Sequence, residues 1–498
     1  MHSAVAATDA EPASLAKRWG LWVALASLVA VLLLPPMRDL PVAGQRTLAI
    51  LAFAVVLWIT EAVDYAISAV IVTALMAFLL GLSPSVGKPA ELLGTGAALA
   101  LALGGFANTA LALVAAALFL SVAMTVTGLD RRIALVILSK VGARTSRVLA
   151  GAIVVGIVLS FLVPSTTARV SCLVPIMMGI IMAFGLDKKS RFAGLIMIST
   201  AQAASIWNVG VKTAAAQNMV AIGFIERTLK VSITWLDWLV AAAPFAIVMS
   251  VVLYVVMLRL MPPETEEVPG GAASIKVALA QLGPMTPAEW RLLAITAALL
   301  GFWVTEKVLH DFDTSSTTVA AIALMFMPVV GVMGWKAAQS RIPWGTIVLF
   351  GTGISLGTAL LQTRAAAWLA NLIVANLGLG QMSAFMILAV LSAFLVVVHL
   401  GFASATALAS AMIPIMIAVL QKVETPVNVA GMTMLLQFVV SFGFILPVNA
   451  PQNMVAYGTE TFSARDFVRT GLALTVAAYL LVLLLGATYW RWMGYLGG

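Results

Sequence analysis

The chain has very few of the residues that enzymes and metal sites depend on. Of its 498 residues only 10% are charged, three are histidines and one is a cysteine. The single Cys172 excludes an internal disulfide and leaves no second cysteine for a metal site. The histidines, at positions 2, 310 and 399, are too few and too scattered for a catalytic metal cluster. We therefore expect neither an enzyme nor a bound cofactor.

The same chain is unusually rich in apolar residues. Hydrophobic residues make up 62% of the sequence and the mean hydropathy is +1.08, whereas a soluble domain carries about 25% charge. Its apolar runs approach the roughly 20 residues that cross about 30 Å of hydrocarbon. The sequence therefore predicts an all-α integral membrane protein with a lipid bilayer as its surroundings. We expect about eleven spans, over 19–36, 45–62, 65–82, 106–128, 190–207, 235–260, 287–306, 314–333, 344–363, 428–446 and 468–490.

Two further pairs of apolar segments are too short to be ordinary spans. They cover 146–163 with 168–184, and 382–399 with 407–421, and each pair is separated by a polar break. Non-helical backbone at membrane depth is tolerated only against protein or water. We therefore expect two re-entrant hairpins that enter and leave the membrane on one side. The basic stretch 130–147 looks amphipathic and is expected to lie along the inner surface.

The distribution of basic residues predicts an orientation. With the N-terminus inside and eleven spans, the cytoplasmic segments hold about twice as many Lys and Arg residues as the outer ones, as the positive-inside rule requires. The net charge of +8 therefore follows from membrane topology and does not predict a nucleic-acid partner. We expect an uncleaved first span, a cytoplasmic N-terminus, an outer C-terminus and a cell-membrane location, most simply a bacterial inner membrane.

Three sequence patterns occur twice, in one order and at a shift of about 240 residues. The run 165–168 (Ser-Thr-Thr-Ala) is echoed at 404–407 (Ser-Ala-Thr-Ala), 217–221 (Gln-Asn-Met-Val-Ala) recurs at 452–456, and 58–61 is echoed at 303–306. Duplicated membrane halves, here of opposite orientation, are typical of secondary transporters whose site lies where the halves meet. We expect a tail and first span (1–44), a first repeat (45–261), a polar cytoplasmic linker (262–286) and a second repeat (287–495).

Polar residues gather at four interruptions of the apolar pattern. They lie at 164–167, 208–218, 404–406 and 447–453, and none contains Asp or Glu. Pro447 and Pro451 remove backbone donors and interrupt a helix. A helix that restarts after such a break presents free N–H groups and a positive dipole end. Together with Ser and Thr hydroxyls, these breaks suit a small anion.

The residues at these breaks resemble the divalent anion/sodium symporter family of the ion transporter superfamily. The resemblance rests on the two Ser-x-Thr motifs, on 57–62 (Leu-Trp-Ile-Thr-Glu-Ala), on 128–135 (Gly-Leu-Asp-Arg-Arg-Ile-Ala-Leu) and on 446–453 (Leu-Pro-Val-Asn-Ala-Pro-Gln-Asn). It implies a homodimer in which a transport domain moves like an elevator against a scaffold, with the substrate between the hairpin tips. The substrate-binding residues it indicates are Ser165, Thr166, Thr167, Ser404, Ala405, Thr406, Asn218, Asn449, Pro451 and Asn453.

The chain departs from the family pattern where sodium would bind. The family's motif asparagine is replaced by Thr166 in one hairpin and by Ala405 in the other. Lys212 lies within the break at 208–218, and Arg169 and His399 lie two and five residues from the Ser-x-Thr motifs. An intramembrane charge is a functional candidate. We expect Arg169 and Lys212 to compensate the substrate's charge in place of sodium, and His399 to couple a proton. The alternatives are cations that snorkel to the interface or pair with a carboxylate, a neutral packed histidine, and a sodium ion near Ser404, Thr406 and Asn449.

The sequence thus predicts a secondary carrier of small divalent organic anions, of the C4-dicarboxylate kind, that works by anion exchange or is linked to protons. The alternative is a sodium-coupled symporter of a dicarboxylate, tricarboxylate, sulfonate or sulfate. A cation or arsenite antiporter would want acidic residues in the breaks, and the broken helices of a repeat favour alternating access over a channel.

Overall fold

A computed structural model describes residues 15–142, 144–183, 185–266 and 271–497. Within these ranges the chain is helical and has no β-strand beyond two isolated bridges. The first half contains α1 (Leu15–Leu33), α2 (Val42–Thr60), α3 (Tyr65–Leu75) with the π-helix η1 (Met76–Leu80), α4 (Thr95–Leu103), α5 (Thr109–Thr127), α6 (Leu129–Leu138), α7 (Thr145–Leu162), α8 (Thr166–Ala183), α9 (Arg191–Gly210), η2 (Lys212–Ala214), α10 (Ala216–Leu229) and α11 (Trp235–Leu260).

The second half follows after α12 (Gly271–Gln281), a helix inside the region predicted as a polar linker. Its elements are α13 (Pro287–Thr305), α14 (Thr314–Phe326), α15 (Trp335–Gln339), α16 (Trp344–Gln362), α17 (Ala365–Leu377), η3 (Leu379–Gln381), α18 (Ala384–His399), α19 (Ala405–Leu420), α20 (Val429–Val440), η4 (Pro447–Asn449), α21 (Pro451–Tyr457), α22 (Ala464–Ala487) and α23 (Tyr489–Trp492).

Each predicted span and hairpin arm coincides with a helix, but some helices end early. Among the described residues, eight helices are long and apolar enough to cross a membrane. The helix in the predicted span 314–333 stops at Phe326, because Pro328 disfavours helical backbone at the residue before it. The amphipathic stretch 130–147 is not one helix: α6 ends at Leu138, Gly142 adopts a φ of 82°, and α7 begins at Thr145.

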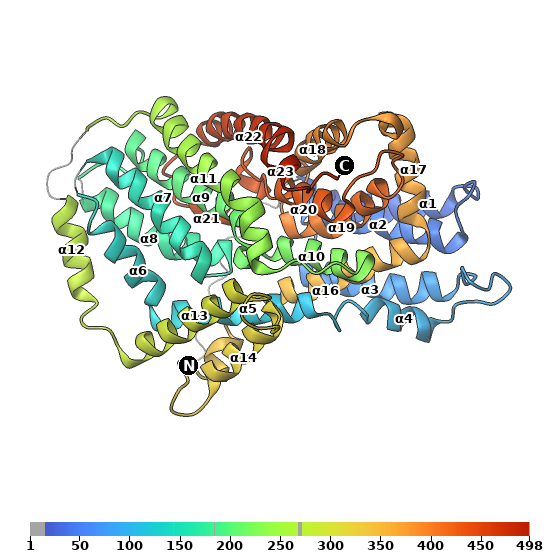
Figure 1. The fold of residues 1–498 in the computed structure, drawn as a ribbon, viewed down its shortest axis with the longest axis horizontal. Coiled ribbons are helices and arrows are strands. Elements are labelled where there is room, and N and C mark those ends of the chain that lie inside the picture. The colour runs from blue at the N-terminus through green and yellow to red at the C-terminus, as the bar shows by residue number, and fades with distance from the viewer. Residues whose placement is uncertain (1–14, 143, 184, 267–270, 498) are drawn as a thin grey trace, which may run out of the picture.

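The two hairpins lie toward opposite ends of the long axis. In Figure 1, α7 and α8 lie with α6 and α12 at one end, and α18 and α19 lie near α17 toward the other. Capping boxes fix the starts of α11, α13 and α22 through Thr234, Thr286 and Ser463. Each hairpin's returning helix contains one proline, Pro175 in α8 and Pro414 in α19.

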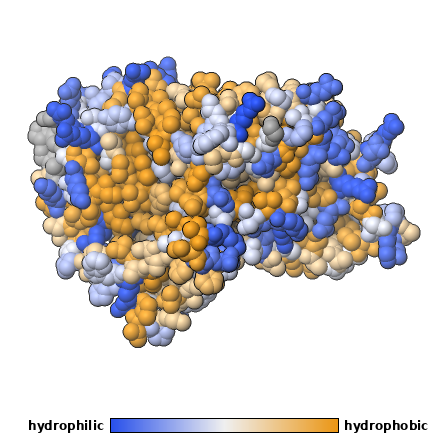
Figure 2. Space-filling model, viewed as in Figure 1, coloured by the Kyte–Doolittle hydropathy of each residue, from blue (hydrophilic) through white to orange (hydrophobic). Residues whose placement is uncertain are grey.

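Large apolar side chains cover much of the outer surface. Figure 2 shows a broad hydrophobic area over the left half of the visible face, with hydrophilic residues at its edges and across the right half. On α11, Ile247 and Val251 are exposed, and on the neighbouring α22 Leu480 and Leu484 are exposed. Contiguous apolar surface of this kind suits contact with lipid.

The two broken helices of the halves have matching backbones. Val211 and Ala215 flank η2 in extended conformation, and Leu446 and Ala450 flank η4 in the same way. The breaks are also held alike. Asn218 Nδ2 donates to the carbonyls of Asn208 (2.7 Å) and Val211 (3.2 Å), and Asn453 Nδ2 donates to those of Gly443 (2.8 Å) and Leu446 (3.4 Å).

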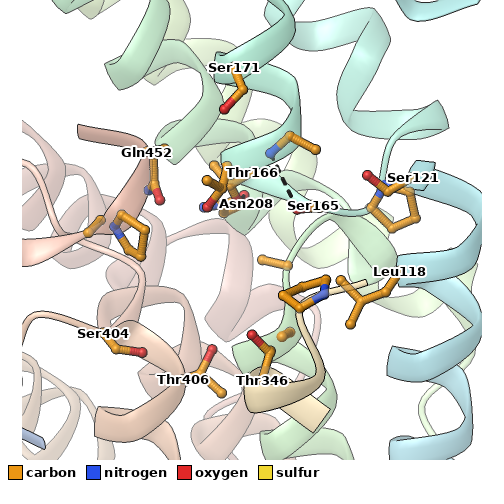
Figure 3. Close-up of a pocket in the computed structure, with 18 of the residues that line it drawn as sticks. Leu118, Ser121, Ser165, Thr166, Ser171, Asn208, Thr346, Ser404, Thr406 and Gln452 are labelled. Atoms are coloured by element: carbon orange, nitrogen blue, oxygen red, sulfur yellow. Dashed lines mark hydrogen bonds between the residues drawn. The ribbon is translucent and has the colours of Figure 1, made fainter. Parts of the chain in front are cut away.

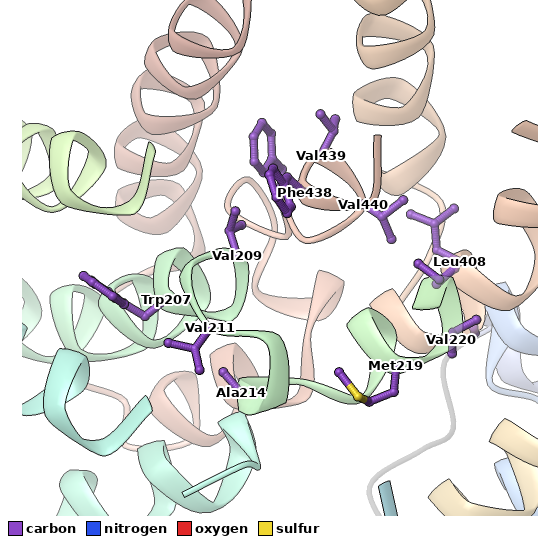
Figure 4. Close-up of a cluster of buried hydrophobic side chains, with 14 of the residues drawn as sticks. Trp207, Val209, Val211, Ala214, Met219, Val220, Leu408, Phe438, Val439 and Val440 are labelled. Atoms are coloured by element: carbon purple, nitrogen blue, oxygen red, sulfur yellow. The ribbon is translucent and has the colours of Figure 1, made fainter. Parts of the chain in front are cut away.

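Hydrogen bonds and apolar packing then tie one half to the other. Gln217 Nε2 donates to Ser441 Oγ (3.3 Å), and the duplicated Gln452 donates back to Ser205 Oγ (3.1 Å). Figure 4 shows buried side chains from both halves around the first break. The cluster includes Trp207, Val209, Val211, Ala214, Met219, Val220, Leu408, Phe438, Val439 and Val440, all at most 4% exposed.

Candidate functional site

The tips of both hairpins and both helix breaks line one cavity of about 700 Å³. Figure 3 shows Ser404, Thr406 and Thr346 on one side of it and Thr166, Asn208 and Gln452 on the other. Most of its polar lining consists of hydroxyl and amide groups. From the break regions the lining includes Pro164, Ser165, Thr166, Thr167, Ala168, Asn208, Ala215, Ala216, Gln217, Ser404, Ala405, Thr406, Ala450, Pro451 and Gln452.

Several helices begin at this cavity. The first residues of α8, α10, α19 and the short α21 all belong to its lining. Ser165 Oγ accepts a hydrogen bond from the N–H of Ala168 (3.4 Å), and Ser404 Oγ accepts one from Ala407 (3.3 Å). A serine hydroxyl that accepts in this way keeps its own O–H free to donate. The cavity therefore offers hydroxyl donors and helix N-termini, which is a setting that favours an anion.

The Asn208 amide contacts the first hairpin motif at the cavity lining. Thr166 Oγ1 donates to Asn208 Oδ1 (2.6 Å), and Arg169 Nη2 donates to the same oxygen (2.6 Å). These two donors fix the orientation of the amide, since a reversed amide would place N–H groups against N–H and O–H donors. The NH₂ group of Asn208 is thereby left as the part that faces the cavity. An asparagine from α9 thus lies in the cavity lining next to the first hairpin motif.

Arg169 lies directly behind this layer and is fully buried. Its Nη1 donates to the carbonyls of Val163 (2.9 Å) and Ala214 (3.1 Å), and its Nη2 also donates to that of Ala204 (3.3 Å). These carbonyls come from the hairpin tip, from η2 and from α9. A guanidinium is permanently charged and presents its donors in a fixed plane. It therefore occupies a cage of carbonyl oxygens of the kind that suits a small cation.

The second hairpin uses an amide where the first uses a guanidinium. Asn449 Nδ2 donates to the carbonyls of His399 (3.0 Å), Leu400 (3.3 Å) and Phe402 (2.9 Å), and its Oδ1 accepts from the N–H of Leu446 (3.2 Å). The His399 ring is 2% exposed, and neither ring nitrogen has a hydrogen-bond partner within the described ranges. The carbonyls near the suggested sodium position are thus occupied by amide N–H groups.

Lys212 points away from the cavity. Its Nζ donates to the carbonyl of Ile233 (2.6 Å) and approaches Thr314 Oγ1 (3.5 Å). Thr314 in turn donates to the carboxylate of Glu306 (2.6 Å). Lys212 is thus part of a buried polar cluster between η2 and the start of α14. Its charge acts on the cavity only from a distance.

The sequence-derived candidates therefore fall into two layers. Lining the cavity are Ser165, Thr166, Thr167, Ser404, Ala405, Thr406 and Pro451, whereas Asn218, Asn449, Asn453, Arg169, Lys212 and His399 lie outside its lining. Sequence reasoning missed the contributions of Gln217, Gln452, Tyr65, Thr346 and Arg341. The glutamines carried a usable signal, because they open the duplicated run. Tyr65, Thr346 and Arg341 come from segments outside the four breaks.

Comparison with known proteins assigns the chain to a family. Residues 15–496 match the family described as the sodium:sulfate symporter transmembrane region. The chain belongs to this family of divalent anion/sodium symporters. It is accordingly a membrane transporter and not an enzyme, as the sequence predicted. Groups of three or more His, Cys, Asp or Glu residues that could hold a metal ion do not occur in the described part of the chain.

The names of similar proteins mention different substrates, and some mention none. A membrane protein of Cupriavidus necator is 57% identical over 96% of this chain and 93% of its own length. A citrate/succinate antiporter of Escherichia coli is 27% identical (78% and 80% covered), and a sodium-dependent dicarboxylate transporter of Staphylococcus saprophyticus is 24% identical (89% and 85%). The crystal structure of the YdaH transporter of Alcanivorax borkumensis has a similar fold, with a TM-score of 0.56 at 14% identity, covering 87% of this chain and 98% of that one.

Proposed function

We propose that this transporter exchanges small divalent organic anions of the C4-dicarboxylate kind across the membrane without sodium. The observation that carries the proposal is the Arg169 guanidinium, which is held by three backbone carbonyls and Asn208 directly behind the cavity. One relative is named a citrate/succinate antiporter, which supports both the exchange mode and the substrate class.

The fixed charge explains why exchange is favoured over one-way transport. In a sodium-coupled carrier the cation arrives with the substrate and leaves with it, so the empty site is neutral. Arg169 remains in place when the anion has gone, and an uncompensated charge in the membrane interior is costly. The empty site therefore resists crossing, and return with a second anion is the favourable step.

The remaining candidates take supporting roles in the proposal. Lys212 adds a second positive charge close to η2. His399 lies at the end of α18, and protonation of its ring would add positive charge next to the second hairpin, which is how a proton-linked mode would arise. We further propose the two inverted repeats, the elevator motion and the homodimer that the family resemblance implies. The boundaries are those given by the sequence, with 45–261 and 287–495 as the repeats.

The direct test is counterflow in proteoliposomes that contain purified protein. Vesicles preloaded with succinate are expected to accumulate labelled succinate from outside, whereas vesicles without internal anion accumulate little. Unlabelled C4-dicarboxylates are expected to compete best, ahead of citrate, sulfonates and sulfate. Equal uptake into empty and preloaded vesicles would contradict obligatory exchange. Competition by sulfate alone would contradict the substrate class.

A further inference from the structure

Arg341 brings a full positive charge to the cavity from a part of the chain outside both hairpins and both breaks. Of the described residues that line the cavity, it is the one charged side chain. Its Nη1 donates to the carbonyl of Ala337 (3.1 Å), which orients the guanidinium. Ion pairs between Arg341 and a carboxylate do not occur in the described ranges. The other donors of its guanidinium are therefore available to an anion.

The segment that carries Arg341 is anchored on α5. Ala338 and Ile342, on either side of Arg341, are buried in a small apolar cluster with Val122 of α5. Phe119 of α5 stacks on Trp335 at a ring distance of 5.6 Å. The cluster contains no buried residue of either hairpin, and Phe119, Phe326, Met333 and Ile347 connect it to the main core. The segment with Arg341 is therefore held by α5 and not by either hairpin. We assign α5 and Arg341 to the scaffold of the proposed elevator, which does not move with the hairpins.

A second cavity shows from which side Arg341 is reached. It has a volume of about 490 Å³ and shares Thr125, Ser171 and Cys172 with the lining of the first. It continues along α8 to Arg131 of α6 and Ile275 of α12. The distribution of basic residues places α6 and α12 on the cytoplasmic side. The lining of the second cavity also includes the buried Asp130, so the route between the hairpin tips and this side passes Arg341, Arg131 and one carboxyl group.

We propose that Arg341 binds the carboxylate of a dicarboxylate substrate only while the cavity is open to the cytoplasm. The hairpin tips hold the substrate throughout the cycle, whereas Arg341 contacts it in one of the two states. Because the interaction exists in that state alone, it raises the apparent affinity on one face of the membrane and not on the other. This inference rests on the proposed function.

The test measures exchange from each face separately. Labelled succinate is presented to the outer face in whole cells and to the cytoplasmic face in inside-out vesicles. For Arg341→Gln we expect the KM at the cytoplasmic face to rise at least about tenfold, a loss of one good charged contact, and the KM at the outer face to change less than about twofold. Arg341→Lys is expected to recover part of the loss. Lys336→Gln removes the same charge from the neighbouring α15, whose lysine does not line the cavity, and should change neither value.

Two results would overturn the role of Arg341. One is a KM for Arg341→Gln that matches the wild type at both faces, and the other is an equal rise at both faces. Wild-type exchange in the same vesicles separates this test from that of the proposed function. A wild type that carries no dicarboxylate refutes both, whereas an active wild type with an unaffected variant refutes Arg341 alone.

Discussion

An Arg169→Ala variant is expected to lose at least about 99% of sodium-free succinate exchange. The substitution removes hydrogen bonds from a charged group to Asn208 and to the carbonyls of Val163, Ala204 and Ala214. A hydrogen bond to a charged group contributes about 1.5–3 kcal/mol, and about 1.4 kcal/mol corresponds to a factor of ten. Loss of two such bonds thus accounts for a hundredfold effect.

The same variant gives a sharper result when sodium is added. The substitution leaves a cage of three carbonyl oxygens and an amide oxygen without its cation, and oxygens of this kind are sodium ligands. We therefore expect 100 mM sodium, about the concentration of a physiological salt, to restore part of the exchange in Arg169→Ala while leaving the wild type unchanged. Arg169→Lys keeps the charge and should retain more activity than Arg169→Ala. Loss of activity in both variants with no sodium response, in protein that still elutes as a folded peak, would show that Arg169 does not replace sodium.

Asn208→Asp should abolish anion binding while leaving the fold intact. The new carboxylate would pair with Arg169, which already donates to this position at 2.6 Å, and would accept the hydroxyl of Thr166. It would also place a negative charge at the cavity lining. Like charges about 4 Å apart repel by about 4 kcal/mol at an effective dielectric of 20. Because the positive charge of Arg169 offsets part of this repulsion, we expect at least a hundredfold loss of exchange, which corresponds to about 2.8 kcal/mol.

Thermal unfolding separates this prediction from simple damage. Asn208→Asp should unfold at or above the wild-type temperature, and succinate should no longer raise that temperature as it does in the wild type. Asn376→Asp is the matched control, because it adds the same charge on the exposed face of α17. An Asn208→Asp variant that still exchanges succinate at the wild-type rate would remove Asn208 from the substrate layer.

The sequence alone predicted the helices whose bounds are set by apolar runs and by prolines. The span predicted over 235–260 has the same bounds as α11, and the predicted hairpin arms match α7, α8, α18 and α19 to within a few residues. Long apolar runs and their interruptions can be identified directly from the amino-acid sequence. Short helices such as α4 and α17 were missed because they are too short for a spanning segment.

The roles of the polar residues depended on contacts that no local pattern contains. Lys212 lies in one break and Arg169 lies next to another, yet the first side chain points to Ile233 and Thr314 and the second into the carbonyl cage. Depth in the membrane was predictable for both, but the direction of a side chain on an unwound segment was not. Asn208 was recognisable as part of a break, but its hydrogen bonds with Thr166 and Arg169 became visible only in the structure.

The central claim is that a fixed arginine does the work of a co-transported sodium ion. Its most direct test is wild-type succinate counterflow measured twice, once in sodium chloride and once in choline chloride at the same concentration. We predict equal rates in the two salts, because the Arg169 guanidinium occupies the carbonyl cage in both. Counterflow that occurs in sodium and stops in choline would contradict the claim and make the protein a sodium-coupled symporter.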